Sequence, residues 1–113
     1  MKYEGLIQMM LRKKLFNRVE SDAGFVIKIR AFQGFVEYRE GRRIATVPVQ
    51  PVFGRGLVSV YMDTPVKWNP PDTADVILEK KRTEILKNIV DAMQFRKYKV
   101  EVVEKTKGRG RAE

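Results

Sequence analysis

The sequence contains neither cysteine nor histidine, and these two absences exclude much of metal and catalytic chemistry. Without cysteine the chain has no disulfides and no thiolate chemistry. Without histidine it lacks the commonest general base and the commonest metal ligand. Zinc sites built from Cys and His are therefore excluded. An enzyme would have to work with carboxylates, Lys, Tyr, Ser or Thr alone, so we expect no catalytic activity, no metal and no cofactor.

Long hydrophobic runs are also missing, because no apolar stretch approaches the roughly 18–20 residues that cross a membrane. Residues 1–14 hold a short apolar stretch that Gln8 interrupts, and their basic cluster follows this stretch instead of preceding it. A secretory signal peptide has the opposite order. Together with the absence of cysteine, this pattern predicts a cytoplasmic protein.

The composition is typical of one small globular domain. The chain has 113 residues, of which 43% are apolar and 33% charged, enough for one modest hydrophobic core. We expect a single α+β domain at residues 23–104, preceded at 1–22 by a basic N-terminal helix and turn. Residues 105–113 have almost no apolar side chains and are expected to form a flexible basic tail.

The formal net charge of +9 is concentrated at the two ends of the chain. Residues 1–18 hold five basic residues and one acidic residue, a net of +4. Residues 105–113 hold four basic residues and one acidic residue, a net of +3. The remaining residues, 19–104, hold fourteen basic and twelve acidic residues, a net of +2. The predicted domain is therefore nearly balanced in charge.

Hydrophobic periodicity predicts the secondary structure. Residues 5–16 follow a helical rhythm and predict a short amphipathic helix, which either packs on the sheet or binds a membrane surface or a partner. Residues 17–24 suit a turn. Alternation predicts strands at 25–30, 35–39, 43–49 and 57–62, followed by a helix over 75–97 and a strand at 98–103. This order favours an antiparallel sheet of four or five strands with the long C-terminal helix packed across one face.

The segment Trp68-Asn-Pro-Pro71 contains the only tryptophan and is the most informative part of the chain. Two consecutive prolines restrict φ and remove two backbone donors, and Asn69 before them is biased towards extended geometry. The turn is therefore stiff and presents Trp68 in a defined direction. The Trp68 ring either anchors a protein partner or closes the end of the core beneath the helix.

Acidic residues flank this turn at positions 63, 72 and 75. Neighbouring carboxylates can hold a hard cation, but their spacing fits no calcium-loop pattern. We therefore interpret Thr73 or Asp75 as the N-cap of the following helix, because Thr and Asp side chains accept hydrogen bonds from the first helical N–H groups.

The order of these parts resembles the immunity protein 74 family, whose members are small proteins predicted to neutralise toxins of bacterial polymorphic toxin systems. The resemblance runs from about residue 34 to residue 103. It is carried by the Trp68 turn, the acidic patch after it, the Arg82-x-x-Ile85 rhythm of the helix and the final Val-Glu-Val strand. It implies a non-catalytic bacterial protein that binds a cognate toxin and occludes it.

Two predicted hairpins interleave cations with aromatic residues and form the candidate binding surface. For a toxin partner, we predict contacts through Lys28, Arg30, Arg39, Arg42 and Arg43, with Trp68 at the rim. A basic inhibitor suits a toxin with an acidic cleft, unlike the basic cleft of a nuclease.

Two other functions stay open at this stage. A single-stranded DNA- or RNA-binding protein would stack bases on rings and place cations along the phosphates. Strands followed by one helix also look, loosely, like the PC4-like single-strand-binding coactivators. The residues of that alternative are Lys28, Arg30, Phe32, Phe35, Tyr38, Arg39, Arg42 and Arg43. The remaining possibility is an accessory module whose basic helix docks onto a larger complex.

Overall fold

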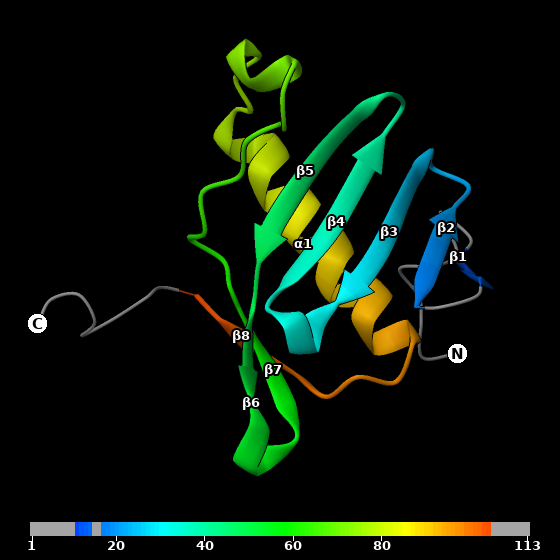
Figure 1. The fold of residues 1–113 in the computed structure, drawn as a ribbon, viewed down its shortest axis with the longest axis vertical. Helices are drawn as coiled ribbons and strands as arrows, with labels where there is room; N and C mark the ends of the chain where they lie inside the picture. The colour runs from blue at the N-terminus through cyan, green and yellow to red at the C-terminus, as the bar shows by residue number, and fades with distance from the viewer. Residues whose placement is uncertain (1–10, 15–16, 105–113) are drawn as a thin grey trace, which may run out of the picture.

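The computed structural model describes residues 11–14 and 17–104, which form two β-sheets and one long α-helix (Figure 1). The larger sheet is antiparallel, with its strands in chain order: β1 (Leu11–Lys14), β2 (Arg18–Ser21), β3 (Phe25–Arg30), β4 (Phe35–Glu40) and β5 (Arg43–Pro48). The smaller sheet has the order β6 (Gln50–Val52), β7 (Leu57–Tyr61) and β8 (Val100–Val103), with β8 parallel to β7. Helix α1 (Glu79–Phe95) lies behind β3, β4 and β5 in Figure 1. The predicted α+β class is confirmed.

In the described part of the chain, three short 3-10 helices connect the strands and the helix: η2 (Ala31–Gln33), η3 (Phe53–Arg55) and η4 (Asp72–Ala74). The hairpins on either side of β4 turn at Gly34 and Gly41, which have φ of 96° and 65°. Glycine adopts such positive φ without the steric penalty that a Cβ brings. Pro48 is the last residue of the edge strand β5.

The core lies between the larger sheet and α1. Alternation along β3 buries Phe25, Ile27 and Ile29, and the register sets Ile27 opposite Tyr38 of β4. The helix contributes the fully buried side chains Ile85, Leu86, Ile89 and Met93. The long helix predicted from the sequence is thus confirmed over Glu79–Phe95, whereas Leu78 precedes it and is exposed.

The N-terminal part of the sheet differs from the prediction. Residues 11–14 form β1 and residues 18–21 form β2, where a helix and a turn were expected. Leu11 pairs with Ser21, and Val19 pairs with Ile27 of β3. A helical rhythm over so short a stretch is a weak signal, and here pairing with a neighbouring strand replaces it.

The β2–β3 pairing crosses the domain boundary predicted between residues 22 and 23. The rest of the predicted N-terminal helix, residues 5–10 and 15–16, lies outside the described residues, and so does the predicted tail at 105–113. The division of the chain into these segments stays a prediction.

The C-terminal half also corrects two expectations. The strands at 57–61 and 100–103 form the smaller sheet with β6 instead of joining the larger one. Helix α1 begins at Glu79, and Leu78 is its N-cap without a side-chain hydrogen bond. Neither Thr73 nor Asp75 caps it, because η4 and an extended stretch separate them from the helix. The Asp75 carboxylate instead forms an ion pair with Arg43 at 2.8 Å.

Candidate functional site

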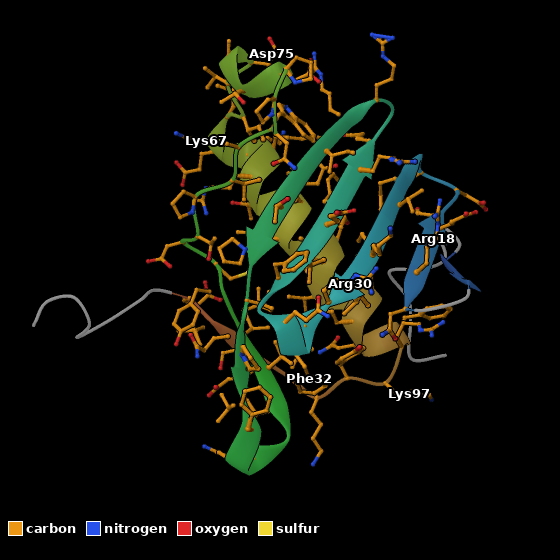
Figure 2. All side chains as sticks on the ribbon, viewed as in Figure 1. Arg18, Arg30, Phe32, Lys67, Asp75 and Lys97 are labelled. Atoms are coloured by element: carbon orange, nitrogen blue, oxygen red, sulfur yellow. The ribbon has the colours of Figure 1, made fainter. Side chains whose placement is uncertain are left out.

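The face of the larger sheet that points away from α1 is the candidate site, and we call it the open face. In the part of the chain that the structure describes, α1 covers the opposite face and no helix lies over this one (Figure 1). Figure 2 looks onto the open face, where Arg18 and Arg30 are labelled. Its residues alternate with the core residues along four strands: Arg18, Glu20, Val26, Lys28, Arg30, Phe35, Glu37, Arg39, Ile44 and Thr46.

The open face carries an excess of positive charge, with four cations and two carboxylates among those residues. The register places Lys28 between Arg18 and Glu37, and sets Arg39 opposite Val26. Arg18 Nε lies 3.7 Å from a Glu20 carboxylate oxygen. Both groups are partly exposed, so this pair contributes little to stability.

The relief of the open face is shallow. Its central depression has a volume of about 30 Å³ and is lined by Arg18, Val26, Lys28, Glu37 and Arg39. Pockets for small molecules are typically about 300–1,000 Å³. The open face therefore suits contact with a broad surface better than capture of a small ligand.

Three of the predicted partner-binding residues come together on the open face: Lys28, Arg30 and Arg39. Arg42 is exposed at the β4–β5 turn. Arg43 lies on the other side of the sheet, in line with buried Ala45, and its guanidinium sits 5.8 Å from the centre of the Trp68 ring.

Arg18 joins the cluster although the sequence analysis placed it in a turn. The alternation in Arg18-Val-Glu-Ser21, which buries Val19 and Ser21, is the signal that could have identified this strand.

Trp68 is only 4% exposed, which favours the second of its two predicted roles, closing the end of the core, over that of a partner anchor. Its ring lies 6.4 Å from that of Tyr38, and its backbone forms an isolated bridge with Ala45 of β5. The Asn69 N–H donates to the Ile44 carbonyl oxygen at 2.6 Å. Trp68 thus closes the end of the core, and it does not stand at the rim of the open face.

The aromatic residues proposed for stacking bases do not share one surface. Tyr38 is fully buried on the core side of β4. Phe35 is half-buried on the open face, and Phe32 is exposed in η2 at the end of the sheet. Base stacking requires accessible ring faces beside the cations. Tyr38 cannot supply one, so the structure gives no support to the stacking surface predicted from the sequence.

Replacing Tyr38 by phenylalanine tests whether the buried Tyr38 hydroxyl has a hydrogen-bond partner. Burial raises the pKa of the Tyr38 hydroxyl, the Glu40 charge adds to the rise, and the Asn88 amide offsets part of it. By geometry, the buried hydroxyl has no hydrogen-bond partner in the described part of the chain, although the Asn88 amide lowers its pKa. Removing an unsatisfied buried hydroxyl costs little.

We expect the free energy of unfolding of Tyr38→Phe, measured with urea, to stay within about 1 kcal/mol of the native value or to rise. A larger loss would show that the hydroxyl has a partner.

Within residues 11–14 and 17–104, no group of three or more Asp or Glu side chains is arranged to hold a metal ion. The pKa of Asp91 is raised by burial, against an opposing effect of Lys87, but both residues belong to α1. No helix in the described part of the chain has the length and apolar character needed to cross a membrane.

In the described part of the chain, the open face is thus a charged surface of shallow relief. Residues 28–103 match the family model described as Immunity protein 74. The match covers more than half of the chain, which therefore belongs to the immunity protein 74 family, as the Trp68 turn and the following helix had indicated. It begins within β3 and ends with β8, and thus includes most of the open face. Neither a search of curated proteins nor a search of solved structures found a match.

Proposed function

We propose that this protein neutralises a cognate toxin domain by binding it through the open face and occluding its active-site cleft. Family membership carries the proposal, since residues 28–103 constitute an immunity protein 74 domain. Immunity proteins are generally non-catalytic and act by binding. We further propose that the protein acts in the cytoplasm, the compartment predicted from its sequence.

The charge of the open face supports this mode of binding. Lys28, Arg30 and Arg39 lie on two adjacent strands, and Arg39 is exposed. A positive surface attracts a negative one over several ångströms and speeds association with it. The expected partner surface is an acidic cleft or rim, which argues against a nuclease, because a nuclease cleft is commonly basic to hold phosphates.

A triple variant tests the assignment of the open face. Lys28→Ser, Arg30→Ser and Arg39→Ser together remove three charges from partly or fully exposed positions. Against the cognate toxin domain, to be identified among the products of the neighbouring genes, we expect slower association and a dissociation constant about ten-fold or more above that of the unmodified protein. Surface plasmon resonance at two salt concentrations measures both quantities.

A matched control variant distinguishes the effect of removing charges from the open face from the effect of lowering the net charge of the protein. Lys67→Ser, Lys80→Ser and Lys87→Ser remove the same number of charges from exposed sites away from the open face. This control should bind the toxin domain like the unmodified protein. Equal losses in both variants would show that net charge matters and the open face does not.

The unmodified protein decides between toxin binding and the nucleic-acid alternative. It should bind the toxin domain saturably and protect cells that express it. Absence of both effects would contradict the proposed function. Binding of single-stranded oligonucleotides tighter than about micromolar at near-physiological salt would exceed typical non-specific attraction and favour the alternative.

A further inference from the structure

Three aromatic side chains that the proposed contact surface does not use gather at one end of the molecule, and we call them the aromatic patch: Phe32, Phe53 and Tyr98. The Phe32 and Phe53 side chains are 54% and 69% exposed. The ring centre of Phe32 lies 5.8 Å from that of Phe53 and 6.1 Å from that of Tyr98. Figure 2 labels Phe32 and Lys97 in the lower half of the view, away from Asp75 at the top.

The three rings come from segments far apart in the chain, and backbone hydrogen bonds hold each segment. Gly34 N–H donates to the carbonyl oxygen of Ala31 in η2, and Gly56 N–H donates to that of Val52 beside η3, both at 3.0 Å. Tyr98 N–H donates to the carbonyl oxygen of Met93 at 3.0 Å. The rings are therefore positioned before any partner arrives, which lowers the entropy cost of binding.

The aromatic patch has a positively charged border. Residues 29–35, 50–57 and 95–100, which supply the rings, contain five basic residues and no acidic residue. Arg30 lines a shallow cavity of about 140 Å³ together with Phe32 and Tyr98. Because Arg30 also belongs to the open face, the two surfaces are continuous.

Lys97, next to Tyr98 of the aromatic patch, is a non-glycine residue with a left-handed backbone conformation. Its φ is +73°, and the bonds from Lys97 N–H to Gln94 O and from Tyr98 N–H to Met93 O close the end of α1. This C-terminal motif normally has glycine at the left-handed position, because a Cβ is strained there. The chain carries an exposed cation at this position despite the backbone strain.

We propose that the aromatic patch is the apolar anchor of the toxin interface, inserting Phe32 and Phe53 into a pocket with an acidic rim on the partner. This inference rests on the proposed function and adds a second, apolar contact to the charged one. Aromatic residues and Arg are enriched at interface centres, and clustered anchors carry most of the binding energy. Phe32 lies against both Phe53 and Tyr98, so the three rings form one compact apolar surface. Such a surface suits a protein pocket better than successive nucleic-acid bases.

A double variant tests the anchor, with the same cognate toxin domain as the probe. Phe32→Ser with Phe53→Ser should raise the dissociation constant by about 30-fold or more, mainly through faster dissociation. The control Val76→Ser with Leu78→Ser removes a comparably exposed apolar pair, 80% and 71% exposed, from the acidic segment around Asp75. It should bind the toxin domain like the unmodified protein.

Lys97→Gly separates binding from folding. Glycine relieves the positive φ, so we expect an equal or higher melting temperature, together with weaker toxin binding from the lost charge. A residue with a purely structural role could not produce this combination, and unchanged affinity would remove Lys97 from the interface.

Each remaining outcome has a definite meaning. Unchanged toxin affinity in the phenylalanine double variant overturns the anchor and leaves the proposed function intact. Failure of the unmodified protein to bind the toxin domain overturns both. A dimer of the unmodified protein that the double variant converts to a monomer, or oligonucleotide binding that the double variant abolishes, also overturns the toxin anchor, because either result assigns the patch to another partner.

Discussion

Replacing Ile89 by aspartate is expected to unfold the protein. Ile89 is fully buried in the middle of α1, on the face that packs against the larger sheet. Aspartate would place a carboxylate among apolar side chains without a cationic partner, at a cost of roughly 4 kcal/mol or more. Small domains are typically stable by about 5–15 kcal/mol, and a core of this size lies at the lower end. One substitution therefore removes most of the stability.

Far-UV circular dichroism and urea denaturation of the Ile89→Asp variant measure this loss. Thr83→Asp is the matched control, since it introduces the same side chain at an exposed position of the same helix. The control should keep the native spectrum. A native spectrum and melting curve for Ile89→Asp would mean that this face of α1 is not packed against the sheet.

Replacing Trp68 by alanine is expected to have the second largest effect, a loss of about 3–5 kcal/mol. The indole is almost fully buried and closes the core next to Tyr38. Its removal leaves a cavity, and it also removes the ring over which the Arg43 guanidinium lies. We expect a clearly lower urea midpoint, together with toxin affinity that is unchanged under conditions where the variant is folded.

Trp68→Phe is the conservative comparison for this experiment, because it keeps an aromatic ring in the same place and should lose less stability than Trp68→Ala. If Trp68→Ala instead kept its stability and lost toxin binding, Trp68 would be a contact residue, and its burial in the core would not describe its role.

The local sequence pattern was sufficient to predict those strands and that helix whose packing partners are close to them in the sequence. The strands at Phe25–Arg30 and Phe35–Glu40 are joined by tight hairpins, so alternation and turn glycines determine both strand and partner. The apolar stripe around Ile89 likewise needs only the helical repeat. Strands β7 and β8 are different, because they pair with each other although the whole of α1 separates them in the sequence. No local signal states that they form their own sheet.

The candidate site could be predicted in part for the same reason. Lys28, Arg30 and Arg39 follow from alternation within one hairpin. Arg43 lies on the same side of the sheet as buried Ala45, because residues two apart on one strand share a face. The grouping of Phe32 with Phe53 and Tyr98 depends on how distant segments meet, and periodicity contains no information about it.

The segment around Trp68 has a consequence for how this protein avoids aggregating. In the described part of the chain, β5 is one of the two edge strands of the larger sheet, and an edge strand offers unpaired backbone groups to any other chain in a β conformation. The bridge from Trp68 to Ala45 and the bond from Asn69 to Ile44 occupy part of that edge from within the molecule. Substitutions that detach this segment would therefore do more than lower stability. They would uncover a template for intermolecular strand addition, and the damaged molecules would be lost to aggregates before they had unfolded completely.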